Sequence, residues 1–383
     1  MFKKQLTKLV GYGRWMKRGL SAASREKVYR AYLKHKNISR PSDRVGVCYG
    51  DHIGNVRGIA QQGIGEVTGG QVKLGYLQER FPHEPEKFNV LYLVSSALPP
   101  FPIMLSRWAK SNGVKVVLNQ NGVAYSAWTP DHEAINAELR ELFALADFIV
   151  YQSEFCKRAA DRYVDKPQCP WKILFNCVDL ERFKPDPLNV RNDVTRLLVA
   201  GTHYQAERVT HPIQVVHELR KSGINATLDI AGRLRWENAK TEVATLVEQL
   251  ELGTSVRITG PYSQVSAPLI FARADILMHL KYKDPCPNVA IEALASGVPV
   301  IGTMSGGLPE LVGVSAGAGM LLDVADDWDQ MHYAAAGELS QAVEQIVNMY
   351  NEYTESARKR AELLFSADHW IAEHELFLDD LLS

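Results

Sequence analysis

Residues 284–310 read DPCPNVAIEALASGVPVIGTMSGGLPE, and this stretch predicts a loop, a helix, a strand and a second helix in succession. Asn288 suits the N-cap of the first helix, and Gly297 suits the residue just after its end. VPVIGT is a short apolar run with β-branched residues, which is typical of a strand buried on both faces. The stretch therefore predicts one unit of an α/β fold with a parallel sheet.

The same stretch combines two helix starts with three acids, Asp284, Glu292 and Glu310. A tight turn is expected at residues 305–307, and Pro309 suits the first turn of the helix that follows. The uncapped N–H groups at a helix start attract a phosphate, and carboxylates accept hydrogen bonds from sugar or ribose hydroxyls. The stretch is a candidate site for such a ligand, and the alternative is an ordinary strand–helix unit with surface acids.

Strand and helix patterns alternate on both sides of a polar segment, DPLNVRNDVTR at residues 186–196. The expected strands are VGVCYG (45–50), NVLYLVSS (89–96), VKVVLNQNG (114–122) and DFIVYQS (147–153) before it, and RLLVAGTH (196–203), ATLDIAG (226–232), SVRITG (255–260) and DILMHL (275–280) after it. Two doubly wound parallel-sheet domains are therefore expected, with a site between them at the carboxyl ends of the strands. We expect an N-terminal domain at 1–188, a C-terminal domain at 189–365, and a final helix at 366–383 that packs back on the first domain.

Bulk composition is that of a globular protein, since 46% of the 383 residues are apolar, 23% are charged and the net charge is −1. This balance does not favour nucleic acid as a partner. The five cysteines have no zinc-ligand spacing, which favours free thiols in a reducing compartment. Neither a membrane-spanning apolar run nor a secretory signal is evident, so a cytoplasmic location is expected.

The first 40 residues are strongly basic, with twelve lysines or arginines against one acid, Glu26. Apolar residues such as Val28, Tyr29, Tyr32 and Leu33 recur among the cations at helical spacing. Such a segment can lie on an anionic membrane surface, which would make the protein peripheral on the inner face of the membrane. The alternative is a helix that packs on the first domain with its cations in solvent.

Four segments occur in an order and spacing that resemble a known family: YQSEFCKRAAD (151–161), ILFNCVDLERFKP (173–185), LLVAGTH (197–203) and residues 284–313. The family is the retaining glycosyltransferases of family 4, with the GT-B architecture of two Rossmann-like domains facing a central cleft. The last segment looks like the family's E-x7-E motif followed by GG-x-P-E. The resemblance implies a nucleotide-diphosphate sugar as donor, a hydroxyl of a glycan or lipid-linked acceptor, retention at the anomeric carbon and no bound metal or other cofactor. It also suggests a role in surface polysaccharide biosynthesis.

The resemblance assigns Asp284 to the transferred sugar and Glu292 to the ribose hydroxyls, as the two acids of the motif. The other donor-site residues that it implies are Gly54, Gly201, Arg208 or Arg233 for the diphosphate, the helix-start residues Asn288, Val289 and Ala290, and Gly306, Gly307 and Glu310. A leaving diphosphate gains charge as the glycosidic bond breaks, so N–H groups fixed at a helix start act mainly on the transition state.

Several positions depart from the family pattern. Asp284 stands where most members carry Glu, and Asn121 stands where many carry a His near the scissile bond. Asparagine can hydrogen-bond a hydroxyl but cannot take a proton at neutral pH. Gly54 is the nearest match to the family's glycine-rich loop, and Arg208 is the nearest cation, one position out of register. The structural alternatives are an Asx turn at Asn121, a helix-capping acid at Glu292 and an ordinary loop arginine at Arg208.

Three functions remain open on the sequence. The first is a glycosyltransferase, in which Asp284, Glu292 and Asn121 are the catalytic candidates. The second is a non-catalytic GT-B subunit that binds nucleotide-sugars or acts as a scaffold, because of the departures just named. The third is another GT-B activity, such as a sugar-nucleotide epimerase.

Overall fold

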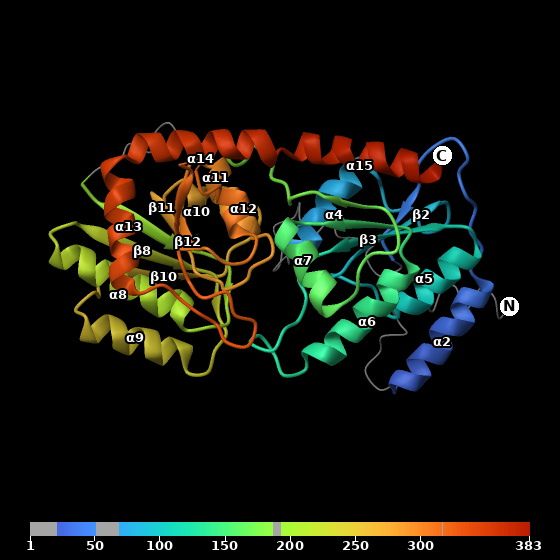
Figure 1. The fold of residues 1–383 in the computed structure, drawn as a ribbon, viewed down its shortest axis with the longest axis horizontal. Coiled ribbons are helices and arrows are strands. Elements are labelled where there is room, and N and C mark those ends of the chain that lie inside the picture. The colour runs from blue at the N-terminus through green and yellow to red at the C-terminus, as the bar shows by residue number, and fades with distance from the viewer. Residues whose placement is uncertain (1–20, 51–68, 187–192, 316) are drawn as a thin grey trace.

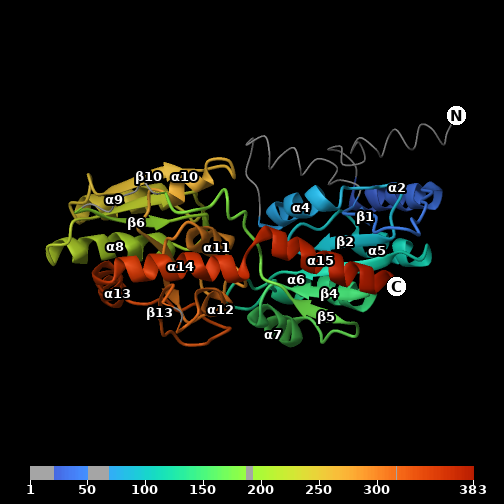
Figure 2. The same ribbon diagram turned by 90° about the horizontal axis from the view of Figure 1, so that it is seen from above.

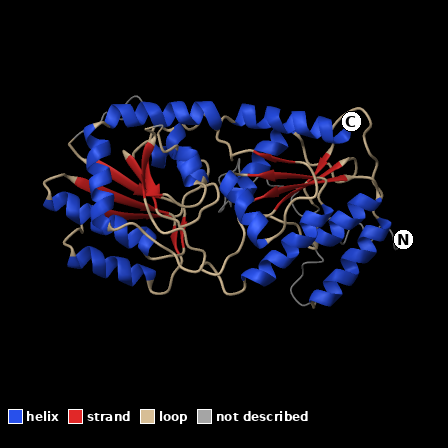
Figure 3. Cartoon of the chain, in the orientation of Figure 1, coloured by secondary structure: helices blue, strands red, loops and turns tan. Residues whose placement is uncertain are grey.

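The computed structural model describes residues 21–50, 69–186, 193–315 and 317–383 (Figure 1). Two α/β domains lie side by side along the long axis of the molecule, each with one main sheet between helices (Figure 3). This arrangement confirms the prediction of two parallel-sheet, Rossmann-like domains.

The N-terminal sheet is parallel and has the strand order β1-β2-β3-β4-β5. Its strands are β1 Val47–Cys48, β2 Val90–Val94, β3 Lys115–Gln120, β4 Phe148–Tyr151 and β5 Trp171–Ile173. Its helices are α2 Ala22–His35, α4 Gly69–Arg80, α5 Pro102–Ser111, α6 His132–Leu145 and α7 Glu154–Tyr163. Because the sheet is parallel, β2, β3 and β4 all end at the edge that faces the second domain.

The C-terminal sheet is also parallel, in the order β10-β8-β6-β11-β12-β13. The strands are β6 Thr195–Val199, β8 Ala226–Ala231, β10 Val256–Gly260, β11 Ile276–His279, β12 Val300–Thr303 and β13 Gly319–Leu322, and β7 Thr202–His203 pairs separately with β9 Arg233–Leu234. The helices are α8 Glu207–Lys221, α9 Ala239–Gln249, α10 Ala267–Phe271, α11 Asn288–Ala295, α12 Leu308–Val312, α13 Ala336–Asn348 and α14 Tyr350–Leu364.

The central strands of the C-terminal sheet are buried on both faces, as their apolar runs predict. On β11, Leu277 faces one hydrophobic cluster and Met278 faces the other. Val300 and Ile301 divide in the same way on the neighbouring strand β12. Two packed layers therefore fix the loops at the ends of these strands, including the loop that carries Asp284.

The last helix, α15 (Ala367–Leu382), leaves the C-terminal domain and runs along the N-terminal domain (Figures 1 and 2). Its Phe377 ring stacks on Phe148 of β4 at a centroid distance of 4.6 Å. His374 is buried beside it, with Nε2 2.8 Å from the hydroxyl of Tyr92. The chain thus crosses the domain boundary twice, which ties the two domains together.

Helix α2 holds most of the described part, residues 21–40, of the basic N-terminal segment. Its Tyr29 and Leu33 are buried in the N-terminal core, and the Tyr29 ring lies 5.4 Å from that of Phe101. The cations Lys27 and Lys34 are exposed. Among the residues described, no helix is long and apolar enough to cross a bilayer.

Helices α8 and α4 differ from what the sequence pattern predicts. The segment PIQVVHELRKSG (212–223), which follows β7, predicts a helix that begins at Pro212, but α8 begins at Glu207 and contains this proline. Proline removes one intrahelical hydrogen bond, and here the burial of the surrounding helix face outweighs that cost. Helix α4 was not predicted, because GGQVKLGY opens with two glycines and shows little helical amphipathicity.

Candidate functional site

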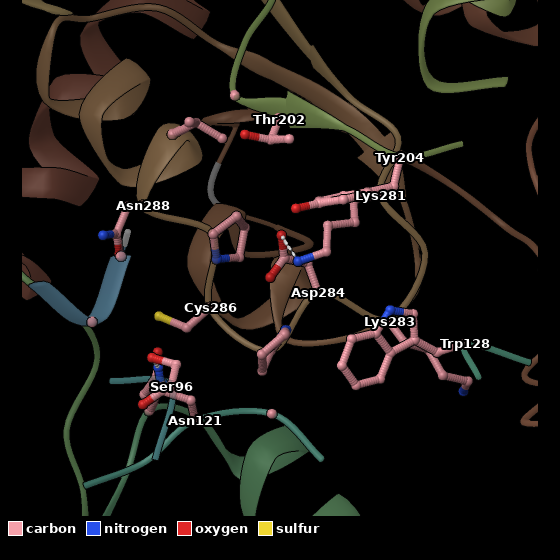
Figure 4. Close-up of a pocket in the computed structure, with 18 of the residues that line it drawn as sticks. Ser96, Asn121, Trp128, Thr202, Tyr204, Lys281, Lys283, Asp284, Cys286 and Asn288 are labelled. Atoms are coloured by element: carbon pink, nitrogen blue, oxygen red, sulfur yellow. Dashed lines mark hydrogen bonds and ion pairs between the residues drawn. The ribbon is translucent and has the colours of Figure 1, made fainter. Parts of the chain in front are cut away.

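A cleft with a volume of about 880 Å³ lies between the two domains, at the carboxyl ends of both sheets. Side chains of both domains line it, among them Asn121 and Ser96 on the N-terminal side and Thr202, Asp284 and Asn288 on the C-terminal side (Figure 4). We call these two sides the N-terminal wall and the C-terminal wall. The described cleft thus occupies the position that the strand pattern predicts for a ligand site.

The start of helix α11 forms the middle of the C-terminal wall. The N-cap residue is Pro287, which has no side chain that could cap the helix. Within the described residues, the backbone N–H groups of Asn288 and Val289 have no hydrogen-bond acceptor. Two donors at the positive end of a helix therefore lie bare in the cleft, an arrangement that binds anions.

Two details of this helix start differ from expectation. Asn288 is the first helical residue and not the N-cap, and its Oδ1 accepts a 2.7 Å hydrogen bond from Asn176 of the other domain. Ala290 is buried, and its N–H donates to the Pro287 carbonyl at 3.1 Å. The N–H of Ala290 therefore cannot serve a ligand as predicted, whereas those of Asn288 and Val289 can.

Asp284 is a buried acid, and its carboxylate oxygen Oδ2 contacts two neighbouring side chains. Its Oδ2 lies 3.2 Å from His279 Nε2 and 3.1 Å from Lys281 Nζ, the ion pair drawn in Figure 4. Burial raises the pKa of this carboxyl, but the Lys281 ammonium and the His279 ring outweigh burial and leave the pKa below its ordinary value. Asp284 is therefore ionised at neutral pH and is a fixed negative charge on this wall.

Glu292 lies on helix α11, four residues after Asn288 and hence on the same face of the helix. It is buried, and among the described residues its carboxylate accepts one side-chain hydrogen bond, from Gln264, whose Nε2 lies 3.4 Å from Oε1. Burial raises the pKa of the Glu292 carboxyl to about 7, despite the opposing charge of Arg182. An acid with so few partners is able to accept hydrogen bonds from a ligand.

Arg208 and Arg233 supply positive charge to the same wall. Arg208 is buried on α8, and its Nη1 donates to the Thr202 carbonyl at 2.7 Å. Burial lowers the pKa of this guanidinium, and the charge of Asp284 acts against that shift. Arg233, at the start of β9, is half-buried and lines the cleft, as does Gly201.

The N-terminal wall has neutral polar groups where β2 and β3 end. Asn121 donates from Nδ2 to the Ser96 hydroxyl, and its backbone N–H donates to Ser95 Oγ at 2.8 Å. Its Oδ1 accepts a 2.9 Å hydrogen bond from Nζ of Lys73, a buried lysine on α4. The Asn121 side chain is thus held by Lys73 and Ser96, neither of which is an acid.

The glycine turn and Glu310 do not line the cleft, which corrects the prediction for these residues. A Cβ at Gly306 would lie 2.5 Å from the Asp284 carbonyl oxygen, and one at Gly307 would lie 2.0 Å from that of Pro285. The two glycines therefore let the turn pack closely behind the Asp284 loop. Gly54 lies outside the described residues.

Glu310 joins the two domains. Its two oxygens accept 2.7 Å hydrogen bonds from the backbone N–H groups of Glu154 and Phe155, at the start of α7. Trp328, also from the C-terminal domain, stacks on Phe155 with the ring centroids 5.6 Å apart. The acid that was expected to contact the donor thus caps a helix of the N-terminal domain.

Sequence reasoning missed several residues that shape the cleft, namely Lys73, Ser96, Gln264, His279 and Lys281. His279 and Lys281 could have been found, because His279 lies near the end of a predicted strand, Lys281 follows that strand directly, and both precede Asp284 closely. No local pattern distinguishes the other three.

Comparisons with known proteins agree with this geometry. Residues 181–360 match the family model described as Glycosyl transferases group 1. The chain is 27% identical over 149 residues to an MMP alpha-(1->4)-mannosyltransferase of Mycolicibacterium hassiacum, a match that covers 39% of this chain and 35% of that protein. It is 26% identical over 193 residues to a lipopolysaccharide 1,2-N-acetylglucosaminetransferase of Salmonella typhimurium, covering 47% of this chain and 49% of that protein. These matches span less than two thirds of either relative.

Solved structures show the same fold. HepE of Anabaena, in a crystal structure with UDP and glucose, superposes with a TM-score of 0.59 at 14% sequence identity. The superposition covers 80% of this chain and 81% of that chain. Both domains and their arrangement are therefore shared, and the architecture is GT-B.

Proposed function

We propose that this protein is a retaining glycosyltransferase that moves a sugar from a nucleotide-diphosphate sugar to a hydroxyl of a glycan or lipid-linked acceptor. One observation carries the proposal: the bare start of helix α11 lies in the interdomain cleft with the buried acids Asp284 and Glu292 on the same wall. An anion site beside acceptors for hydroxyl groups fits a ligand that contains both a diphosphate and sugars.

In this proposal the donor lies along the C-terminal wall. The diphosphate accepts hydrogen bonds from the N–H groups of Asn288 and Val289, and Arg208 and Arg233 balance its charge. Glu292, one helical turn further along the same face, accepts the ribose hydroxyls. The family match at residues 181–360 includes every one of these residues, which supports this placement.

Catalysis would depend on charges that are fixed before the sugar arrives. The leaving diphosphate gains negative charge in the transition state, and the N–H groups of α11 stabilise that charge without rearranging. The ionised Asp284 faces the transferred sugar and stabilises positive charge that develops on its ring. Asn121 cannot take a proton, so it serves as a hydrogen-bonding group, and the family resemblance makes the departing phosphate the acceptor of the proton from the incoming hydroxyl.

We further propose surface polysaccharide or glycolipid synthesis at the cytoplasmic face of a membrane. The support is the lipopolysaccharide transferase among the relatives and the exposed cations Lys27 and Lys34 of α2. Because Tyr29 and Leu33 of this helix are buried in the domain core, the membrane contact would be electrostatic. Sedimentation with anionic vesicles should depend on residues 1–40, and equal binding by the protein without them would exclude this segment as the anchor.

A turnover panel tests the proposal. Purified protein is incubated with UDP-, GDP- and ADP-sugars, with and without glycan and glycolipid acceptors, and the released nucleoside diphosphate is measured. Release from at least one donor, with a product that keeps the anomeric configuration, is expected. Binding without turnover would favour the scaffold alternative, and an epimerised donor formed without any acceptor would favour an epimerase.

A further inference from the structure

Lys73 is a lysine buried beneath the N-terminal wall. It lies on α4 and is only 1% exposed. Its Nζ donates to Oδ1 of Asn119 at 2.8 Å and to Oδ1 of Asn121 at 2.9 Å. A fully buried ammonium is costly in free energy, so a position of this kind calls for an explanation.

No carboxylate of the described residues forms an ion pair with Lys73. The titratable groups that face it are the thiols of Cys156, Cys177 and Cys286. On the other side, Asn119 Nδ2 donates to the Tyr92 hydroxyl, which in turn bonds to His374. All these groups are neutral near pH 7, because burial raises the pKa of the thiols and lowers that of His374 to about 3. Within the described part of the chain, the ammonium is therefore stabilised by two amide oxygens, those of Asn119 and Asn121.

This contact decides which way the Asn121 side chain is turned. A lysine ammonium has no acceptor atom, so the atom of Asn121 that it contacts must be the amide oxygen. The amide nitrogen then donates one hydrogen to Ser96, and its second hydrogen has no acceptor among the residues that the structure describes. The ammonium also polarises the amide, which strengthens its N–H groups as donors.

We propose that Lys73 is a positioning residue that turns the Asn121 carboxamide so that its N–H, and not its oxygen, serves the substrate in the cleft. The matching substrate group is an acceptor oxygen, either a hydroxyl of the transferred sugar or an oxygen of the donor phosphate. The inference rests on the proposed function for the identity of this substrate and on the structure alone for the orientation of Asn121.

Side-chain NMR tests the orientation without any activity assay. In protein labelled with ¹⁵N-asparagine, the Asn121 NH₂ signals are assigned by their loss in Asn121→Ser. Burial lowers the pKa of Lys73 to about 8, so these signals should move as the pH crosses that value. The movement should vanish in Lys73→Met and persist in Lys172→Met, a control lysine of the same domain that pairs with Glu373. Asn121 signals that do not respond to pH or to Lys73→Met would overturn the proposal.

Kinetics test the consequence. Lys73→Met should lower kcat on the order of 100-fold with the KM for the donor unchanged, because a misplaced group acts on the transition state more than on binding. Asn121→Asp, which replaces the N–H group with a carboxylate that pairs with Lys73, should lose activity to the same degree while the melting temperature is maintained. An unchanged kcat in either variant would overturn the proposal.

The two readouts separate this inference from the proposed function. If no nucleotide-sugar is turned over but the NMR signals behave as expected, the proposed function fails and the orientation of Asn121 stands. If turnover occurs but the Asn121 NMR signals do not change in Lys73→Met, the proposed orientation of Asn121 fails and the proposed function stands. The wild-type titration needs no variant of Lys73, so loss of folding in Lys73→Met would not prevent a decision.

Discussion

The two walls of the cleft differ in how they use charge. The C-terminal wall presents the ionised Asp284, the titrating Glu292 and the cation Arg208 around the start of a helix. The N-terminal wall presents the amide of Asn121 and the hydroxyl of Ser96, and a buried cation, Lys73, lies behind them. A charged group that contacts the ligand can bind a diphosphate. A charged group that lies behind an amide can only orient that amide. We infer that the first wall holds the nucleotide and the second orients the groups that react.

Hydrogen bonds across the domain boundary connect the two walls of the cleft. Asn288 of the C-terminal wall accepts a hydrogen bond from Asn176 of the N-terminal domain, and Glu310 caps helix α7 across the same boundary. Ser153 Oγ donates to the Pro285 carbonyl at 2.7 Å close by. The loop of Asp284 is therefore supported from both domains.

The largest effect should come from Glu292→Ala. In the proposed donor site this carboxylate accepts two ribose hydroxyls, so its loss would remove two hydrogen bonds to a charged group, and kcat/KM should fall by about 1000-fold. The matched control is Glu248→Ala, which removes an exposed glutamate from helix α9 of the same domain and should leave turnover unchanged. Steady-state kinetics with the donor found in the panel would measure both. Full activity in Glu292→Ala would contradict the role of the C-terminal wall.

Asp284→Asn should have the next largest effect. The change keeps the size of the side chain but removes the charge that, in the proposed function, faces the developing positive charge of the sugar, so kcat should fall by about 100-fold. Binding of the free nucleoside diphosphate should change little, because that ligand lacks the sugar. Calorimetric titration and initial rates on the same preparation would separate the two quantities. An equal loss of nucleotide affinity and of kcat would move Asp284 from the sugar to the diphosphate.

Gly307→Ala should destabilise the turn that packs behind the Asp284 loop of the C-terminal wall. An added Cβ would lie 2.0 Å from the Pro285 carbonyl oxygen, and the resulting backbone shift should lower the free energy of unfolding by about 1–3 kcal/mol. Gly253→Ala is the control, since nothing lies within 4 Å of its added Cβ. Urea denaturation of both variants would measure the difference. Equal stability would show that the turn does not support the Asp284 loop.

The smallest effect should be a pH dependence of stability and of nucleotide affinity that arises from Glu292 of the C-terminal wall. The pKa of Glu292 is raised from 4.5 to about 7, so the folded protein holds this proton where the unfolded chain has released it. Stability from this group is therefore present below pH 4.5 and is lost as the pH rises to about 7. The affinity for a nucleoside diphosphate should have the opposite pH dependence. It should weaken as the pH falls below about 7, by at most ~10-fold per pH unit.

Calorimetry from pH 5.5 to 8 with the wild type and Glu292→Gln would measure this dependence on nucleotide affinity. The glutamine variant should bind more weakly and show a flatter profile, because it cannot lose a proton. A profile that stays steep in Glu292→Gln would assign the titration to another group.

How much the sequence could predict also differs between the walls. The acids and the helix start of the C-terminal wall lie within one short stretch, so local patterns and the family resemblance identified them together. On the other wall, Lys73 and Asn121 are 48 residues apart, and only the folded sheet and helix α4 bring them into contact. Asn121 was found through the resemblance, but its partner could not be, because nothing in GGQVKLGY marks its lysine as buried.

The mistaken roles have the same physical origin. Glu310 was expected to contact the donor, but its partners at the start of α7 lie 155 and 156 residues away in the sequence. Asn288 suited an N-cap by residue type, yet its side chain bonds to Asn176 across the domain boundary. Local propensity predicts what a residue can do, and the tertiary contacts decide which of these options is used.

The most direct test of the account is a crystal structure with the nucleoside diphosphate of whichever donor is turned over. We expect the diphosphate within hydrogen-bonding distance of the N–H groups of Asn288 and Val289, and the ribose hydroxyls on the carboxylate of Glu292. The N-terminal wall should contact neither the base nor the ribose. A nucleotide bound elsewhere, or one whose ribose lies on the N-terminal wall, would contradict the division of roles between the two walls.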